Sequence, residues 1–240
     1  MKLRLMICAA AASTALFAAE DAKSATYAVM NVTNAYTDTV IGVPWVGLDG
    51  TAITISNLVN TTTLSTGDKL YMYDNGTWYE YTKSADGVWT GAETITPTGS
   101  HTAESQVVQR GTGLVLQRKV SGAGGTVLLA GRVDSGTITT TIATGKTLFA
   151  NPTATAVDIN TSGKFADATD GDTISIPLNN GGSDVYTYDG TKSEWGKMTL
   201  VEKTINGRKR KQNEWSKCGS IPAGTGAWYE TTGSGYTVTW

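Results

Sequence analysis

The feature that most constrains the fold of this chain is the alternation of bulky and polar side chains across residues 65–89. The bulky side chains of this segment are Leu70, Met72, Trp78, Tyr79 and Tyr81. An Asp-Asn-Gly turn lies between them at residues 74–76, and alternation with period two around such a turn is a strong hairpin signal. The segment therefore predicts two antiparallel strands joined by a tight turn, with a further turn before Trp89.

The landmarks of this segment and its flanks return in the same order 104 to 113 residues later. The matched pairs are Pro44 with Pro152, Gly67-Asp68 with Gly171-Asp172, residues 78–81 with residues 185–188, Trp89 with Trp195, and Gly111-Thr112-Gly113 with Gly224-Thr225-Gly226. Near-constant offsets predict the duplication of a whole domain, because solenoid repeats have periods of roughly 20–50 residues. Each copy then has the size of a small antiparallel β domain.

The composition agrees with a β protein. Only 17% of the 240 residues are charged and 40% are hydrophobic, with many Thr, Gly and Val. This favours strands and Gly-containing turns over solvated helices, and it excludes a disordered chain. The formal net charge of −2 provides no field that would recruit nucleic acid. We expect an all-β fold of two tandem antiparallel β-sandwich-like units, formed by duplication, after a cleaved signal peptide.

Residues 1–24 have the pattern of a secretory signal peptide, with Lys2 and Arg4 ahead of an apolar stretch at residues 5–19. That stretch is shorter than the ~20 residues that a membrane-spanning helix needs, and no later apolar run reaches this length. The predicted β units are residues 25–120 and 126–240, with the Gly-rich segment 121–125 between them. Cys218 is the one cysteine after residue 24, so we expect no internal disulfide in the exported chain.

The order of the motifs also supports a comparison with a known group. It consists of a strand ending in Pro, a Gly-Asp turn, an aromatic strand, an Asp-Gly-x-Trp turn and a strand that follows Gly-Thr-Gly. In this order the chain resembles uncharacterised exported β-repeat proteins of Verrucomicrobia–Lentisphaerae-type bacteria. The resemblance covers both copies and depends on short turn motifs. It implies export and a β fold, and it implies no activity.

The aromatic side chains have two interpretations. In the first, their rings stack on sugars, and the candidate glycan contacts are Trp78, Tyr79, Tyr81 and Trp89, with Tyr186, Tyr188 and Trp195 in the second copy. In the second, which we favour, they fill the core of each unit, because aromatic residues are common in strands and cross-strand pairs. Neighbours such as Trp78 and Tyr79 point to opposite faces of a strand, so we expect one of them to be exposed.

A basic run follows the second aromatic hairpin, and it consists of Arg208, Lys209, Arg210 and Lys211. One interpretation is the solvated tip of a hairpin that the first copy lacks. The other is an electrostatic contact with an anionic polysaccharide, a lipid or an acidic neighbour in an assembly.

Three carboxylates, Asp167, Asp170 and Asp172, are close enough in sequence to converge on a hard cation. The spacing and the terminal Glu of an EF-hand are missing, and the first copy has only Asp68 at the matching place. We therefore favour a solvated turn over a cation site.

No catalytic constellation stands out in the sequence. His101 is the only histidine, and it lies in a polar segment that is typical of a solvated loop. No Gly-rich phosphate-binding loop precedes a helix. Cys218 is a candidate for a buried thiol or an intermolecular bridge. We expect a non-enzymatic protein without a cofactor or a metal ion.

The leading functional hypothesis is a secreted structural or surface protein, at the cell surface or outside the cell, that assembles with itself through strand edges into fibres or a surface layer. The alternative is an adhesin-like module that binds a polysaccharide through exposed Trp and Tyr. A second alternative is an outer-membrane β-barrel, because residues 235–240 alternate and end in an aromatic residue. No nucleic-acid partner and no helical membrane span are expected.

Overall fold

The computed structural model describes residues 26–34, 38–43, 46–47, 50–58, 64–74, 77–94, 102–103, 105–119, 125–133, 136–178, 182–206, 208–217 and 219–240. Several predictions concern residues outside these ranges. They are the signal peptide at residues 1–24, Pro44, the tip of the first hairpin at residues 75–76, His101, most of the Gly-rich segment at residues 121–124, and Cys218.

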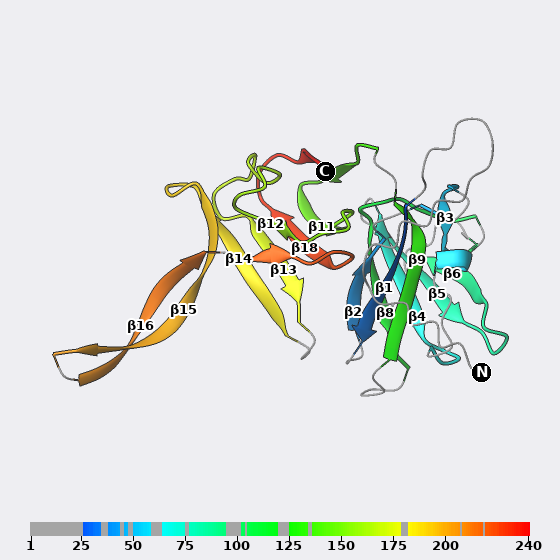
Figure 1. Ribbon diagram of the computed structural model, residues 1–240, viewed down its shortest axis with the longest axis horizontal. Helices are drawn as coiled ribbons and strands as arrows, with labels where there is room; N and C mark the ends of the chain where they lie inside the picture. The colour runs from blue at the N-terminus through cyan, green and yellow to red at the C-terminus, as the bar shows by residue number, and fades with distance from the viewer. Residues whose placement is uncertain are drawn as a thin grey trace, which may run out of the picture.

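The described chain is nearly all β, with 57% of residues in strands and 2% in helix, in several open antiparallel sheets (Figure 1). The all-β class predicted from composition and alternation is therefore confirmed. Its helix, α1 (Ile55–Leu58), is a single turn. In the part of the chain that the structure describes, no helix has the length and apolarity to cross a membrane.

The first half of the chain forms one main sheet with strand order β2-β8-β4-β5-β6, together with the strand pairs β1–β9 and β3–β7. Its strands are β1 (Thr26–Asn34), β2 (Asp38–Gly42), β3 (Ile53–Thr54), β4 (Lys69–Asp74), β5 (Thr77–Lys83), β6 (Trp89–Thr94), β7 (Val107–Val108), β8 (Gly113–Gln117) and β9 (Gly125–Val133). The predicted hairpin is β4–β5, in which Leu70 pairs with Tyr81 and Tyr73 with Trp78.

The second half repeats this arrangement. Its main sheet has the order β11-β18-β13-β14-β15-β16, and its strand pairs are β10–β19 and β12–β17. The strands are β10 (Thr139–Ile142), β11 (Gly145–Ala150), β12 (Val157–Asp158), β13 (Thr173–Pro177), β14 (Ser183–Asp189), β15 (Glu194–Ile205), β16 (Arg208–Lys217), β17 (Ser220–Ile221), β18 (Gly226–Thr231) and β19 (Tyr236–Thr239). Apart from β16, each strand has a counterpart of the same chain order and the same partners among the described strands of the first half.

The strand pairing also shows where one half passes into the other. β9 pairs along its whole length with β1, from Thr26 opposite Val133 to Asn34 opposite Gly125. Residues 126–133, which composition assigns to the second unit, therefore pair with β1 of the first half. A Gly-rich stretch signals flexibility, and it carries no information about which distant strand the next segment joins.

Each half has its own apolar core, and aromatic side chains occupy equivalent places in both. Tyr81 and Trp89 are buried in the first core, and Tyr186 and Trp195 are buried in the second. Tyr81 lies opposite Leu70, and Tyr186 lies opposite Ile174 at the matching position. Tyr81 therefore corresponds to Tyr186, and the expected match of residues 78–81 with residues 185–188 is wrong by two residues. Fully burying a large apolar side chain contributes roughly 1.5–3 kcal/mol, so these rings are a main source of stability in each half.

The Gly-Asp turns before β4 and β13 have the same hydrogen bonds. Gly67 and Gly171 both have positive φ, at 89° and 87°, which glycine adopts without steric cost. The N–H of Gly67 donates to the carbonyl of Lys83 (2.8 Å), and that of Gly171 donates to the carbonyl of Tyr188 (3.0 Å). The backbone carbonyl of the aspartate after each glycine accepts a hydrogen bond from the N–H of the same partner residue, at 2.8 Å for Asp68 and 2.9 Å for Asp172. The two turns are thus built on the same geometry.

The two main sheets meet at a reciprocal seam. The N–H of Gly42 donates to the carbonyl of Gly224, and the N–H of Ala150 donates to the carbonyl of Gly111, both at 2.8 Å. Gly42 and Ala150 end β2 and β11, while Gly111 and Gly224 lie two residues before β8 and β18, so each half gives the other the same bond. A Cβ on Gly42 would overlap the Cβ of Ala150, which shows how closely the two backbones approach here.

Side chains cross the seam in the same reciprocal way. Val40 of the first half lies over Gly226 of the second half, and a Cβ added to Gly226 would overlap Cγ1 of Val40. Leu148 of the second half lies over Gly113 of the first, where an added Cβ would be 2.7 Å from Cγ of Leu148. Val40 and Leu148 are both buried, at 8% and 4% exposure. Glycine is needed at these two positions because the opposite half fills the space of a side chain.

Substitution of either seam glycine should destabilise the protein. We expect Gly113→Val and Gly226→Val each to lower the free energy of unfolding by at least about 1–3 kcal/mol, because the new side chain has no room. Urea unfolding of the two variants measures this. Gly219→Val is the control, because the nearest atom to its added Cβ is the Tyr186 hydroxyl at 4.0 Å. A seam variant as stable as the control would contradict this packing.

Candidate functional site

The candidate glycan contacts of the first half, Trp78, Tyr79, Tyr81 and Trp89, fall into two groups. Tyr81 and Trp89 are 0% and 1% exposed in the first core, so their rings present no face to a ligand. Tyr79 packs partly buried against the same core. Trp78 lies on the opposite face of β5, as expected for neighbours in a strand, but the expectation that one of the two is exposed is wrong, because both are half-buried. Of the four, Trp78 is the one that faces away from the core.

Trp78 belongs to an aromatic cluster between the two halves. Its ring centroid lies 6.2 Å from that of Tyr71 and 5.0 Å from that of Tyr73, which are on the same face of β4. It also lies 5.7 Å from the ring of Trp228 on β18, and Tyr73 lies 5.8 Å from that same ring. Such edge-to-face and tilted pairs add roughly 0.5–1.5 kcal/mol beyond burial, so the cluster helps to hold the halves together.

A groove of about 460 Å³ opens beside this cluster. Trp78 and Trp228 line it, together with polar side chains of β11, β13, β14 and β18. The sequence identifies Trp78 as a candidate and misses Trp228. The sequence offers only the order Ala227-Trp228-Tyr229, and the structure shows that both neighbours of Trp228 are buried on the core face. Trp228 must therefore face the other side of the sheet.

The three carboxylates Asp167, Asp170 and Asp172, considered above as a cation loop, have separate roles. Asp172 is 1% exposed, and its Oδ2 accepts hydrogen bonds from the Thr169 N–H (2.9 Å) and the Tyr229 hydroxyl (2.7 Å). Asp170 is exposed and accepts a bond from the Gly190 N–H (2.7 Å). Asp167 is exposed. The prediction of a solvated turn is therefore wrong for Asp172, which is a buried structural carboxylate.

The buried carboxylate has a counterpart with a different partner in the first half. Asp68 is fully buried, and its Oδ2 lies 2.9 Å from Nε of Arg118, whose side chain is 4% exposed. The N–H groups of Ser65 and Lys119 also donate to Asp68, at 2.7 and 2.8 Å. The first half thus neutralises its carboxylate with a cation. The second half uses a phenol, and burial raises the pKa of Tyr229 so that it stays a donor.

Neutralising the two carboxylates should therefore have unequal effects. Asp68→Asn removes the charge that Arg118 faces in a buried pair, which typically costs about 3–5 kcal/mol. Asp172→Asn keeps an acceptor for Tyr229, and we expect a loss near ~1 kcal/mol. Chemical unfolding monitored by circular dichroism compares the two, with the exposed Asp170→Asn as the control. If Asp172→Asn loses as much free energy of unfolding as Asp68→Asn, the cost does not depend on whether the carboxylate faces Arg118 or Tyr229.

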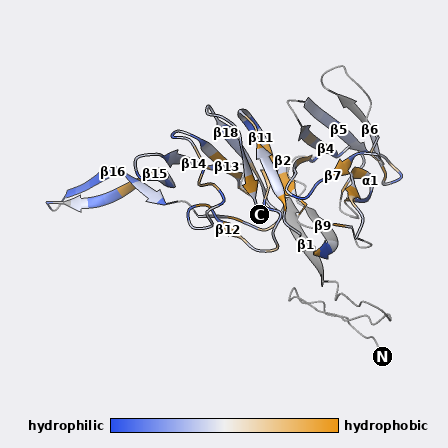
Figure 2. Ribbon diagram, turned by 90° about the horizontal axis from the view of Figure 1, so that it is seen from above, coloured by the Kyte–Doolittle hydropathy of each residue, from blue (hydrophilic) through white to orange (hydrophobic). Residues whose placement is uncertain are grey.

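The predicted basic run lies on an arm formed by residues 194–217, that is β15, β16 and their turn (Figure 1). β15 pairs with β14 only at residues 194–196, and beyond Gly196 it pairs with β16 alone among the described strands. Arg208, Lys209, Arg210 and Lys211 are exposed near the arm's tip. Lys209 forms an ion pair with Glu202 across the hairpin (2.8 Å). Figure 2 shows the hydrophilic colouring of much of the arm.

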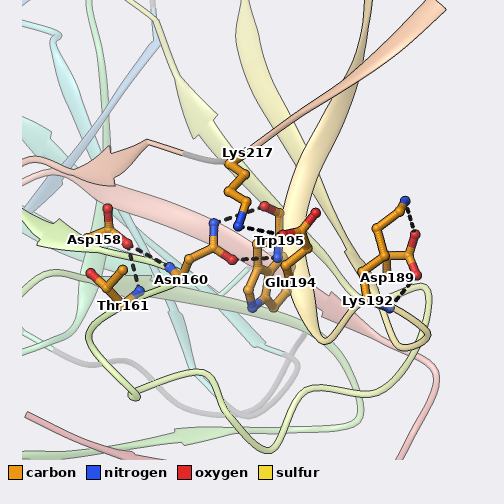
Figure 3. A network of polar contacts seen from close by, with 8 residues as sticks. All are labelled: Asp158, Asn160, Thr161, Asp189, Lys192, Glu194, Trp195 and Lys217. Atoms are coloured by element: carbon orange, nitrogen blue, oxygen red, sulfur yellow. Dashed lines mark hydrogen bonds and ion pairs between the residues drawn. The ribbon is translucent and has the colours of Figure 1, made fainter.

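The root of the arm is fixed to the body by polar contacts (Figure 3). The Trp195 N–H donates to Oδ1 of Asn160 (2.7 Å), and Nδ2 of Asn160 donates back to the Trp195 carbonyl (2.9 Å). Lys217 pairs with Glu194 at 2.8 Å and holds the pKa of that carboxyl below its ordinary value. The arm therefore leaves the body from a defined position.

A second set of contacts lies beside the root. Lys192 donates to Oδ2 of Asp189 at 2.6 Å and lowers the pKa of Asp189 to about 2. The same ammonium lies 4.3 Å from the ring centroid of Trp215 on β16. The Trp215 ring in turn covers Gly196, where an added Cβ would be 2.5 Å from the indole. These contacts orient the arm at the point where it separates from β14.

One face of the arm exposes apolar side chains. Met198 and Leu200 are 60% and 59% exposed, the highest values among the large hydrophobic side chains that the structure describes. They are two residues apart on β15 and therefore share a face, and Trp215 lies directly opposite Met198. A monomer gains nothing from an apolar pair on a projecting hairpin, so this face is a candidate contact surface.

No protein-family model, curated protein or solved structure matches the chain. Within the described ranges, no group of three or more His, Cys, Asp or Glu side chains is placed to hold a metal ion. The arm and the aromatic groove are the features of the described residues that could contact a partner or a ligand.

Proposed function

We propose that this protein is an exported, non-enzymatic structural or surface protein that associates with further copies of itself through the arm. The observation that carries the proposal is the exposure of Met198 and Leu200 on a hairpin that extends beyond the sheets. Apolar side chains in this position are buried when a second molecule covers them, and about 25 cal/mol per Å² of buried apolar area favours that association. The signal-peptide pattern of residues 1–24 supports export.

We further propose that the two halves arose by tandem duplication. Their main sheets have matching strand orders, their Gly-Asp turns have matching hydrogen bonds, and their seam bonds are reciprocal. The two halves differ at the arm. Among the described strands, the first main sheet has no strand that corresponds to β16.

The charge of the arm favours a second copy as its partner. Residues 202–211 contain Lys203, the basic run at residues 208–211 and a single acidic side chain, Glu202. The whole chain has a formal charge of −2, so the remainder is distinctly acidic. A basic tip on one molecule and an acidic body on the next attract each other over about 10 Å at moderate ionic strength.

The geometry favours contact through the face of the arm over strand addition at its edge. β16 is an edge strand in the described sheet, and its exposed edge carries Arg and Lys side chains along residues 208–211. Charged side chains on an edge strand disfavour the addition of another strand. On the face with Met198 and Leu200, the residues directly opposite these two are Trp215 and Asn213, and neither is charged. This proposal refines the strand-edge contact expected from the sequence.

Substitution of the apolar face should weaken association. We expect the mature protein to form concentration-dependent oligomers in sedimentation velocity at low salt. The double variant Met198→Ser with Leu200→Ser should shift these toward the monomer by at least about tenfold in dissociation constant, since burying each side chain favours the complex. Val88→Ser with Val185→Ser is the matched control, because both valines are exposed on the body, at 47% and 45%.

Two results would contradict the proposal. One is a protein that stays monomeric at every concentration and salt condition. The other is an oligomer that the control pair disrupts as much as the arm pair does.

A further inference from the structure

We propose that the groove beside Trp78 and Trp228 binds a neutral oligosaccharide. The proposal is independent of the arm, which lies at the far edge of the second sheet. It differs from the sugar contacts that the sequence suggests, because Tyr81 and Trp89 are excluded by burial and Trp228 comes from the other half of the chain.

The aromatic rings provide the apolar part of the site. Trp78 and Trp228 are both half-buried and both line the groove, so each presents part of its indole to the open space. Their planes are tilted by 59° and their centroids are 5.7 Å apart, which leaves two differently oriented ring surfaces rather than one closed stack. Planar rings held in this way bind the C–H faces of pyranose sugars, and the protein loses little conformational entropy.

Hydroxyl groups provide the polar part. Thr173 and Ser175 are two residues apart on β13 and share one face of the sheet, and Ser175 lies opposite Trp228. Ser183, at the start of β14, completes this part of the lining. Each hydroxyl both donates and accepts hydrogen bonds, as the hydroxyls of a sugar require. A volume of about 460 Å³ is in the range of small-ligand sites and has room for one or two sugar rings.

The charge of the groove selects a neutral ligand. Lys146 and Glu230 are the charged residues that line it, and they form an ion pair at 3.6 Å. The two charges cancel locally, so neither an anion nor a cation gains a net attraction. Both side chains remain exposed, at 61% and 53%, and can still bond sugar hydroxyls. An anionic ligand would instead prefer the basic tip of the arm.

The difference between the halves supports a specific role for this groove. Where the first half has Tyr73 opposite Trp78, the second half has Pro177 opposite Ser183 at the equivalent pair of positions. Where the second half has Trp228, the first half has Val115. The strand scaffold is the same in both halves. Trp78 and Trp228, in contrast, each occur in one half only, and both line the same groove. A purely structural seam would not need this divergence, because the glycine packing is already reciprocal.

The test uses the mature protein and a panel of neutral hexasaccharides with glucan, mannan, xylan and chitin backbones, with oligogalacturonate as the acidic probe. Tryptophan fluorescence and calorimetry should detect binding of at least one neutral probe and a change in indole emission. The double variant Thr173→Val with Ser175→Ala should weaken that binding by about tenfold or more, since it removes two hydroxyl partners without removing a seam ring. Trp78→Ala should weaken it further.

Trp215→Ala, on the arm, is the matched control and should bind as the unmodified protein does. A melting curve for each variant separates loss of binding from loss of folding. The proposal is overturned if no neutral probe binds, if the hydroxyl variant binds as well as the unmodified protein, or if the groove variants weaken oligogalacturonate binding more than they weaken the binding of every neutral probe.

Discussion

The reciprocal hydrogen bonds from Gly42 to Gly224 and from Ala150 to Gly111 are the constraint on which the rest of the structure depends. They join strand ends that are far apart in sequence, and they do so at a backbone separation that only small residues allow. Each half gives the other the same backbone bond, together with a buried aliphatic side chain at the equivalent position, Val40 in one half and Leu148 in the other. The seam therefore defines how the two cores are placed, and it creates the groove in which Trp78 and Trp228 meet.

Within each half, a buried carboxylate anchors the turn that starts the main hairpin. The backbone geometry at Gly67-Asp68 and Gly171-Asp172 is the same, while the partner of the carboxylate is Arg118 in the first half and Tyr229 in the second. The same pattern holds for the rings. Tyr81 and Tyr186 keep equivalent places in their cores, whereas Trp78 and Trp228 have no aromatic counterparts. Scaffold positions repeat, and the positions that differ line the groove or extend the arm.

Much of the local structure could be predicted from the sequence, because its causes are local. Alternation around a turn predicts β4–β5, and Gly-Asp with an aromatic strand predicts the equivalent turn before β13. Trp89 and Trp195 were expected in cores and are buried there. The constant offsets also pointed to the equivalence that the strand orders display.

The remaining features depend on pairings between distant segments. Alternation does not say that β9 returns to β1, nor that Trp228 approaches Trp78. Asp172 looks like a solvated residue because its buried partner, Tyr229, lies 57 residues away. The groove and the seam are made of such long-range contacts, so no short sequence motif predicts them. The basic run, in contrast, was recognised as a hairpin tip because its composition alone makes burial costly.

Hydrogen exchange at the amides of Gly42 and Ala150 tests the seam most directly. Each amide ends a strand, where exchange is fast unless the N–H has an acceptor outside its own sheet. We expect slow exchange at both amides, with similar protection, because the two hydrogen bonds are equivalent. Fast exchange at both, while the strand amides of Leu70 and Ile174 stay protected, would show that the halves fold separately and do not meet at this seam.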